Sequence, residues 1–453
     1  MGLEGAALRT LAGGHACRVE RFVGEGGQGA VYAVTAPGLG PDRYALKWYH
    51  PGRADRRQWD ALVDLIDRDP PHPRFLWPLD LVNAPGLDGF GYLMPFRDDS
   101  YVGLADLVSG RVDADLRQLT TMGMELAESF LYLHNAGLCY CDISFANVFF
   151  QPGTGSVLIC DNDNVTVNES VGSSISGTPY FMAPEIVRGQ AMPSTSTDLY
   201  SLAVLLFYLF LVHHPLEGGR EAAFQTWDDA QIELFGNHPV FIFDPTDASN
   251  APVPGEHDNA IVSWPIYPRF LRDLFTSAFT RGLVDPRNGR VQESVWRSAM
   301  VRLRDGLVYC PACGKLNCTG ANEPPPPCWS CGRAVPMPLA LRIGRFTVML
   351  NHDARVYPHH LRTDYDFSAP IAEVAQHPQR PGVWGLRNLS NQPWTVVGGD
   401  GATGAVEPGR VALIAPGARI GFGPAEGCIV PLAVEPGADG ARGHEGQGAD
   451  VDG

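Results

Sequence analysis

The sequence has no run of lysine and arginine residues that would form a phosphate-binding stripe. Its 453 residues include 34 Lys and Arg against 50 Asp and Glu, and the formal net charge is −16. Nucleic acids and anionic membranes bind to basic surfaces. The composition therefore excludes nucleic-acid or membrane binding as the main function, and we expect neither as a partner.

Long apolar runs are also missing. The longest, residues 199–212, has about fourteen residues, whereas a helix needs about 20 to span a bilayer. The N-terminus lacks the charged segment and apolar segment of a secretory signal. We therefore expect a cytoplasmic protein in which residues 199–212 form a buried helix.

Cysteine is scarce except over a short stretch. Half of the ten cysteines lie between residues 310 and 331, where two C-x-x-C pairs, Cys310 with Cys313 and Cys328 with Cys331, are fourteen residues apart. Such pairs are typical of a tetrahedral Zn²⁺ site with four thiolate ligands. Disulfides are the alternative, and the absence of a secretory signal disfavours them. The pattern predicts a zinc ribbon.

Acidic residues in the middle of the chain have the spacing of a phosphoryl-transfer site. Asp142 is followed five positions later by Asn147, and fourteen residues after that by Asp161. The first carboxylate can orient and deprotonate a hydroxyl group. The Asn and the second Asp offer hard oxygen ligands to Mg²⁺, which neutralises phosphate charge.

Other parts of such a site occur in order along the chain. Residues 24–31 read Gly-Glu-Gly-Gly-Gln-Gly-Ala-Val between two segments of strand character, so glycines Gly24, Gly26 and Gly29 would let a hairpin tip approach phosphates. Lys47 interrupts an apolar strand and needs an anionic partner there. Downstream, residues 177–185 read Gly-Thr-Pro-Tyr-Phe-Met-Ala-Pro-Glu.

Together these motifs resemble the eukaryotic-type (Hanks-type) protein kinase superfamily, with a bacterial-looking Ser/Thr kinase pattern over residues 15–305. The resemblance implies Mg²⁺·ATP as cofactor and a protein Ser/Thr hydroxyl as substrate. Asp142 would be the catalytic Asp, with Thr178 hydrogen-bonded to it, and Asn147 and Asp161 would bind Mg²⁺. Lys47 would contact phosphates. The expected lining of the adenine slot is Val31, Ala45, Met94 and Phe149.

Several positions depart from that family. Cys141 stands where an Arg normally precedes the catalytic Asp, so a phosphate on the activation segment has no obvious partner there. Ser144 replaces the Lys that steadies the γ-phosphate. The usual acidic partner of Lys47 on the following helix is missing. We expect Asp64 to substitute for it, with Asp60 as the second choice, and the alternative is that both belong to a solvent-exposed helix face. We interpret Asp163 as a turn residue, with an extra carboxylate on the metal side as the alternative.

The expected fold class is multidomain α+β. A flexible N-terminus (1–14) precedes a bilobal kinase fold with an N-lobe (15–96) and a C-lobe (97–305). A zinc ribbon (308–335), an all-β sandwich (339–434) and a disordered tail (436–453) follow. The sandwich is predicted from short alternating apolar runs separated by Gly, Pro and Asn turns. Its residues 384–391, 408–409 and 420–423 are similar to forkhead-associated domains, which bind phosphothreonine.

Three functions are compatible with these features. The first is a Mg²⁺·ATP-dependent protein Ser/Thr kinase, favoured by the intact Lys47, Asp142, Asn147 and Asp161. The second is a nucleotide-binding pseudokinase scaffold, suggested by Ser144 and Cys141. The third is an interaction protein, in which the zinc ribbon and the β domain dock a partner. Transfer of phosphate to a protein separates the first from the others, and ATP binding separates the second from the third.

Overall fold

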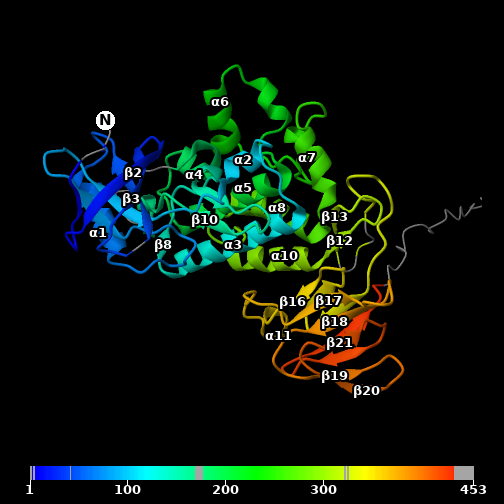
Figure 1. The fold of residues 1–453 in the computed structure, drawn as a ribbon. Coiled ribbons are helices and arrows are strands. Elements are labelled where there is room, and N and C mark those ends of the chain that lie inside the picture. Colours follow the sequence, from blue (N-terminus) through cyan, green and yellow to red (C-terminus); the bar gives the residue numbers. More distant parts are fainter. Residues whose placement is uncertain are drawn as a thin grey trace, which may run out of the picture. The chain divides into compact units, whose positions relative to one another are not determined.

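The computed structural model describes residues 3, 6–40, 42–168, 177–320, 323 and 326–432. The chain forms two compact units (Figure 1). The first contains Met1–Tyr309 and Cys313–Cys318, and the second contains Cys310–Ala312 and Thr319–Gly453. The predicted ribbon at 308–335 is therefore not a unit of its own. The predicted disordered tail, 436–453, lies outside the described residues.

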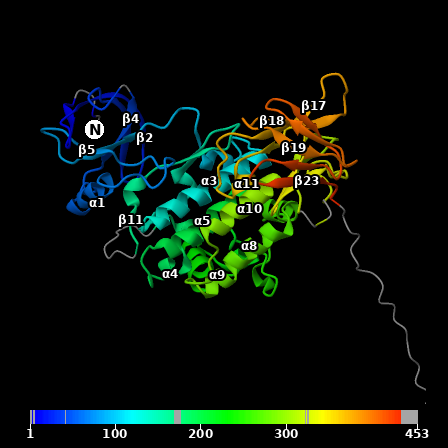
Figure 2. The ribbon, with the colours of Figure 1, turned by 90° about the horizontal axis from the view of Figure 1, so that it is seen from below.

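A closed six-stranded barrel begins the first unit. Its strands follow the order β1-β2-β3-β4-β6-β5, and β1 closes the barrel by pairing with β5. The helix α1 packs against β5 and lies beside the strands in both views (Figures 1 and 2). The bounds are β1 (Leu8–Thr10), β2 (Ala16–Glu25), β3 (Gly29–Thr35), β4 (Arg43–Tyr49), α1 (Arg56–Ile66), β5 (Asp80–Asn83) and β6 (Gly91–Pro95).

The prediction of a flexible N-terminus over residues 1–14 is wrong for Leu8–Thr10. This segment pairs with both β2 and β5, and Leu8 and Thr10 are buried on one side of the strand. Leu8 joins a core cluster with Val34, Leu46 and Val82. Three residues are too short a run to show alternation convincingly, and the Gly and Ala around them hid the signal.

Helices dominate the rest of the first unit. The apolar α5 is buried along most of its length, and α3 packs against both α5 and α10. The helix predicted over residues 199–212 corresponds to α5. The bounds are α2 (Leu104–Val108), α3 (Leu116–Asn135), α4 (Pro184–Val187), α5 (Thr195–Leu211), α6 (Trp227–Gln231), α7 (Asp258–Ser263), α8 (Arg269–Phe279), α9 (Arg281–Val284) and α10 (Glu293–Asp305).

Short strands, 3₁₀ turns and the π-helical turn η5 lie between these helices and after the last of them. The strands are β7 (Val102–Gly103), β8 (Leu138–Cys139), β9 (Val148–Phe150), β10 (Val157–Ile159), β11 (Thr166–Val167), β12 (Leu307–Tyr309) and β13 (Leu316–Cys318). The turns are η1 (Phe145–Asn147), η2 (Asn162–Asn164), η3 (Pro179–Phe181), η4 (Gly219–Ala223), η5 (Ile232–Asn237), η6 (Ala248–Asn250) and η7 (Trp264–Ile266).

The second unit is rich in strands, as predicted for residues 339–434. It has a six-stranded sheet in the order β15-β14-β23-β22-β19-β20 and a four-stranded sheet in the order β16-β17-β18-β21. Side chains of both sheets, such as Leu341 and Leu386, share one hydrophobic core. The bounds are β14 (Ala340–Ile343), β15 (Phe346–Met349), β16 (Arg355–Val356), α11 (His359–Arg362), β17 (Ala372–Gln376), β18 (Trp384–Asn388), β19 (Trp394–Val397), β20 (Thr403–Val406), β21 (Val411–Leu413), β22 (Arg419–Gly421) and β23 (Glu426–Val430).

Among the helices that the structure describes, none has both the length and the apolar character required to cross a membrane.

Candidate active site

Asp142 and Asn147 both lie in the loop between β8 and β9. The Asn147 side-chain amide donates to the Asp142 backbone carbonyl at 2.9 Å and to its carboxylate at 3.3 Å. The Thr178 hydroxyl donates to the other Asp142 carboxylate oxygen at 2.7 Å. The hydrogen bond predicted between Thr178 and Asp142 is therefore present. Two donors fix the carboxylate, and among the described residues the Asn147 amide oxygen has no hydrogen-bond donor, so it can serve another ligand.

A buried carboxylate from α5 supports this loop from behind. Asp198 accepts hydrogen bonds from the backbone N–H groups of Tyr140 (2.5 Å) and Cys141 (3.1 Å). Cys141 has a φ of 71°, which is costly for a residue other than glycine. The two charge-assisted hydrogen bonds hold the backbone in this conformation immediately before Asp142.

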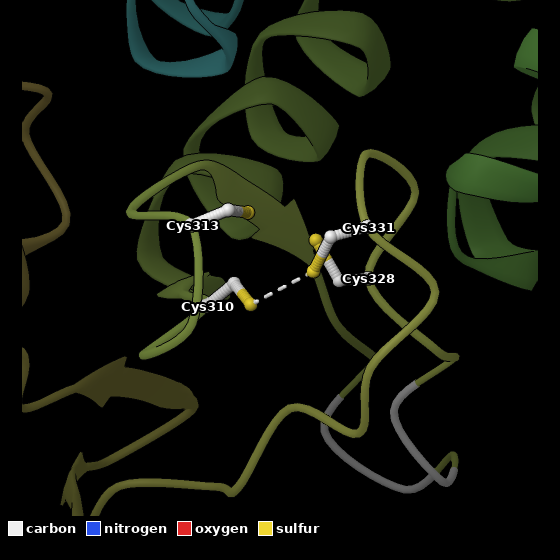
Figure 3. A group of neighbouring side chains, drawn as sticks. All are labelled: Cys310, Cys313, Cys328 and Cys331. Carbon is white, nitrogen blue, oxygen red and sulfur yellow. Dashed lines mark hydrogen bonds between the residues drawn. The ribbon is translucent and has the colours of Figure 1, made fainter.

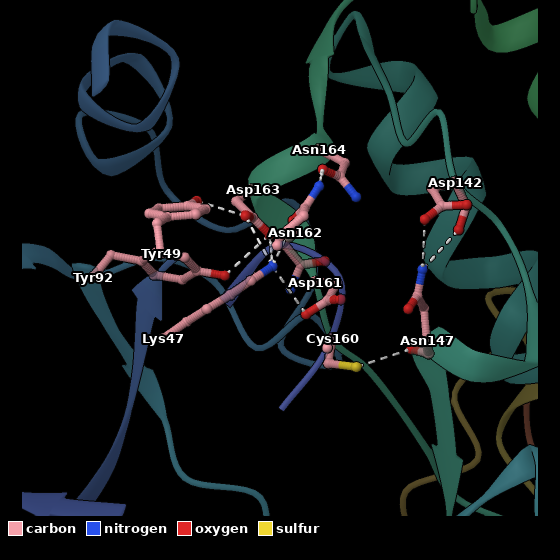
Figure 4. A network of polar contacts seen from close by, with 12 residues as sticks. Lys47, Tyr49, Tyr92, Asp142, Asn147, Cys160, Asp161, Asn162, Asp163 and Asn164 are labelled. Carbon is pink, nitrogen blue, oxygen red and sulfur yellow. Dashed lines mark hydrogen bonds and ion pairs between the residues drawn. The ribbon is translucent and has the colours of Figure 1, made fainter. Parts of the chain in front are cut away.

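Asp161 and Asp163 meet Lys47 at the other side of the site (Figure 4). The Lys47 Nζ lies 3.0 Å from both carboxylate oxygens of Asp163 and 3.4 Å from Asp161 Oδ1. Burial on its own would lower the pKa of Lys47, but the two carboxylates outweigh it and raise that pKa above its ordinary value. Lys47 is therefore a fixed cation.

Asp161 differs from Asp163 in its exposure. Its side chain is 39% exposed, whereas that of Asp163 is fully buried. Burial raises the pKa of Asp161 although Lys47 acts in the opposite direction, and Asp163 and Asp142 raise it further. A carboxylate in such an acidic setting suits a divalent cation, because the cation would offset the repulsion between neighbouring carboxylates.

The prediction that Asp64 or Asp60 of the following helix pairs with Lys47 is wrong. Asp64 is exposed, and Asp60 is exposed and pairs with Arg56 in its own helix, α1. Asp163 does lie in the turn η2, as expected, but its buried carboxylate also takes that partner role, which the sequence did not indicate. The physical reason is reach: Asp163 of η2 lies against the face of β4 and β6 that carries Lys47, Tyr49 and Tyr92, while Asp60 and Asp64 of α1 are exposed.

Sequence reasoning missed three polar neighbours of this network. The hydroxyls of Tyr49 and Tyr92 donate to Asp163, at 2.5 and 3.1 Å, and Gln28 accepts from Lys47 at 2.8 Å. Tyr49 could have been found, because a residue two positions after Lys47 points to the same side of a strand. Tyr92 is the cross-strand partner of Lys47 in β4–β6, and that register is not readable from the sequence.

The glycine hairpin connects β2 to β3 above Lys47. Gly24 pairs with Val31, and the Gly26 N–H donates to Gly29 O at 2.9 Å. A Cβ at Gly29 would lie 2.3 Å from the backbone oxygen of Trp48, so this position admits only glycine. A Cβ at Gly24 or Gly26 would meet nothing within 4 Å, which leaves the space above the hairpin open.

Three of the residues expected around an adenine base share one apolar cluster. Ala45 and Met94 are cross-strand neighbours and are buried together, and Val31 packs against the same cluster. Phe149 lies on β9 opposite Leu158, which also joins this cluster with Cys160. Nothing in the sequence spacing of Cys160 relates it to this cluster.

The four cysteines of the two C-x-x-C pairs also converge. Their Sγ atoms all lie within 4.8 Å of one another, and Cys310 and Cys331 are 3.6 Å apart (Figure 3). Zn–S bonds of about 2.3 Å in a tetrahedron place sulfur atoms about 3.8 Å apart. A disulfide needs about 2.05 Å. The residues therefore fit a zinc ion, and they would hold it through four thiolates.

Comparison with known proteins agrees with this geometry. Residues 93–252 match the family model of the protein kinase domain, a range that includes Asp142, Asn147 and Asp161 but not the glycine hairpin or Lys47. Protein kinase MCK1 of Saccharomyces cerevisiae is 28% identical over 32% of this chain and 39% of its own length. Serine/threonine-protein kinase PknJ of Mycobacterium tuberculosis is 28% identical over 46% of this chain and 36% of its own length.

A third relative, a probable cyclin-dependent serine/threonine-protein kinase of Dictyostelium discoideum, is 27% identical over 56% of this chain and 38% of its own length. The chain thus spans well under half of the length of the curated relatives that it matches. The motifs, their convergence in the first unit and the family match lead to one conclusion: the chain contains a protein kinase domain.

Proposed function

We propose that this protein is a Mg²⁺·ATP-dependent protein serine/threonine kinase. The observation that carries the proposal is the fixed orientation of Asp142: Thr178 and Asn147 both donate hydrogen bonds to its carboxylate. Asp161, from the loop after β10, is close enough for the two carboxylates to interact. An oriented carboxylate at the position of Asp142 can accept the proton of a substrate hydroxyl. The relatives named as serine/threonine kinases support a hydroxyl of Ser or Thr in a protein as the acceptor.

In the proposed reaction the substrate hydroxyl oxygen attacks the γ-phosphorus of ATP. The bond from that phosphorus to the β,γ-bridging oxygen breaks, ADP leaves, and the hydroxyl proton passes to Asp142. Asn147 and Asp161 would hold Mg²⁺, which supplies charge neutralisation on the phosphates. Lys47 would bind phosphate oxygens, and the apolar cluster around Ala45 and Met94 would receive the adenine.

Two aspartate variants separate binding from transfer. Asp142→Asn should abolish transfer and leave Mg²⁺·ATP affinity within about threefold, because its carboxylate acts on the hydroxyl and not on the nucleotide. Asp161→Ala should weaken both. Autophosphorylation with labelled ATP and nucleotide titration would measure the two effects, with Asp113→Asn at an exposed position as control. Equal loss of ATP binding in both variants would contradict the assigned roles.

One observation favours a second candidate, a nucleotide-binding pseudokinase scaffold. Ser144 occupies the place of the Lys that steadies the γ-phosphate, and its hydroxyl is buried with no hydrogen-bond partner among the described residues. It therefore supplies no charge for the transferred phosphoryl group. Wild-type protein that binds Mg²⁺·ATP but labels neither itself nor any Ser/Thr protein would establish the scaffold in place of the kinase.

We also propose structural and docking roles outside the kinase domain. The four cysteines would bind one Zn²⁺ as a structural ribbon.

The strand-rich unit, proposed as a sandwich similar to forkhead-associated domains, would dock a protein partner. Support comes from β21, a sheet-edge strand on which Val411 and Leu413 are exposed, because edge strands can pair with a peptide strand. Arg387 is paired with Glu373 at 2.8 Å, which argues against its use for phosphothreonine.

A further inference from the structure

A buried lysine in a nucleotide site must be held by an acid, and in this chain that acid lies in an unexpected place. The acids of α1 face solvent, whereas Asp163 lies against Lys47. We propose that Asp163, carried by the loop that follows Asp161, positions Lys47 for the nucleotide phosphates in place of an acid on α1. The inference rests on the proposed function and names the residue that aligns its phosphate-binding lysine.

The surroundings of Asp163 fix its carboxylate in one orientation. Lys47 Nζ is 3.0 Å from each of its oxygens, and the hydroxyls of Tyr49 and Tyr92 each donate to one of them. The side chain has no solvent exposure. A buried ion pair of this kind is stable only when its remaining hydrogen-bonding capacity is satisfied, and these two hydroxyls satisfy it. The ammonium group is therefore held at a defined point.

The helix α1 takes part without contributing a charge. Gln58 in its first turn donates to the Tyr49 hydroxyl at 2.9 Å and to the Asp163 backbone carbonyl at 3.2 Å. The helix thus supports the loop that carries Asp163. The position of Lys47 then depends on the short η2 turn directly after Asp161, so that the proposed metal ligand lies two positions before the residue that holds the lysine.

Lys47 has one neutral partner that a nucleotide can replace. An ammonium group has three donors, and Asp163, Asp161 and Gln28 all accept from Lys47. Gln28 belongs to the glycine hairpin, and its amide also donates to Asn164 at 3.0 Å. A phosphate oxygen competes with a neutral amide more easily than with a carboxylate. Asp163 is therefore the partner that remains when the nucleotide is bound.

The choice of lysine at this position is unusual for the chain. Lys47 and Lys315 are the only lysines among 34 basic residues, and all the others are arginine. A compact ammonium fits between two carboxylates and a phosphate, whereas a planar guanidinium requires bidentate geometry. A lysine at this position agrees with a point charge held by Asp163.

A double-mutant cycle tests the inference. Asp163→Asn should weaken binding of a fluorescent Mg²⁺·ATP analogue about tenfold and lower kcat about 100-fold, since loss of alignment acts mainly in the transition state. Lys47→Met should have a similar effect, and the double variant should be no worse than Lys47→Met within about twofold. The rival partner is tested by Asp64→Asn, which should change neither quantity by more than about twofold.

The binding measurement with the fluorescent Mg²⁺·ATP analogue does not require phosphate transfer. It therefore tests the role of Asp163 even if the protein proves to be a scaffold without kinase activity. Additive effects in the double variant, or a loss in Asp64→Asn as large as in Asp163→Asn, would overturn it. If Asp163→Asn does not fold, Tyr92→Phe replaces it. That variant removes one hydrogen bond to Asp163 and keeps every charge. It should lower the melting temperature, because a buried carboxylate loses a donor, and it should weaken binding of the Mg²⁺·ATP analogue several-fold at a temperature where the variant is fully folded. Wild-type affinity under those conditions would overturn the inference.

Discussion

At the scale of single residues, the site has the expected charged groups, but the acid that pairs with Lys47 is Asp163 and not a residue of α1. The intact Asp142, Asn147 and Asp161 were readable from the sequence because their spacing is local. Asp163 was not, because its role depends on a contact with Lys47 over 116 positions of sequence. No pattern in one sequence reports such a contact, and an Asp between two Asn residues is typical of a turn.

Cys141 leads to a prediction about regulation. Its thiol is buried and lies 3.5 Å from that of Cys139, and neither can pair with a phosphate as an arginine would. Replacement of Thr166, Ser170, Ser173, Ser174 and Ser176 by Ala should therefore leave turnover within about tenfold, or about 1.4 kcal/mol of barrier. The four serines lie outside the described residues.

Steady-state rates of this fivefold variant and wild type, at equal folded fraction by thermal melting, give the comparison. A loss of more than about 100-fold would show that another basic residue reads a phosphate on this segment.

At the scale of elements, three helices meet at one buried histidine. His134 of α3 contacts Asp198 of α5 at 3.1 Å through Nε2 and Glu293 of α10 through Nδ1. Burial acts to lower the pKa of His134, but the hydrogen bonds and charges of both carboxylates raise it to about 9. Because Asp198 also holds the backbone before Asp142, this ion triad connects the helical core to the site.

The raised pKa predicts a pH-dependent stability. Since the folded pKa is above the ordinary value of about 6.5, the stabilisation is fully present below pH 6.5 and is lost as pH rises through about 9. The expected loss of unfolding free energy is on the order of 2–3 kcal/mol. Chemical denaturation between pH 6.5 and 9.5, compared with His134→Gln, measures it. The same slope in both proteins would contradict the protonated triad.

The end of α5 offers a stabilising change. Its last cap, Val212, has a φ of 51°, which is costly for a β-branched residue, and its side chain is partly exposed. Val212→Gly should raise the free energy of unfolding by about 0.5–1 kcal/mol, because glycine adopts this conformation without strain. Denaturant titration measures the change, and Val212→Ala, which keeps the Cβ, should give less than half of it.

Element prediction from the sequence succeeded where periodicity is long. In α3 the apolar residues Leu116, Met122, Phe130 and Leu133 recur at helical spacing, and in α5 the apolar run is uninterrupted. It failed for β1, whose three residues are stabilised by pairing with strands on both sides. Residues 213–267 are built from single turns and short helices, which are too short to show a periodic pattern in the sequence.

At the scale of the whole molecule, the two C-x-x-C pairs predicted that four side chains would meet, and their Sγ atoms do lie within 4.8 Å of one another. We predict about one Zn²⁺ per chain, because four thiolates complete one tetrahedral shell. Cys310→Ser should lower the zinc content and expose residues 308–335 to hydrogen exchange, since metal binding contributes much of the folding energy of a ribbon. Metal analysis of purified protein, with Cys318→Ser as a matched control, tests this. Zinc-free wild-type protein with a protected ribbon would contradict it.

The central claim is that the first unit transfers phosphate to a protein hydroxyl with Asp142 as the acceptor of the proton. The most direct measurement is a single-turnover assay with γ-labelled Mg²⁺·ATP, in which phosphoserine and phosphothreonine are identified after acid hydrolysis of the labelled protein. We expect label on Ser or Thr in the wild type and a loss of more than about 1,000-fold in Asp142→Asn, with nucleotide still bound. Bound nucleotide without any transferred label in the wild type, or equal labelling of Asp142→Asn, would contradict the claim.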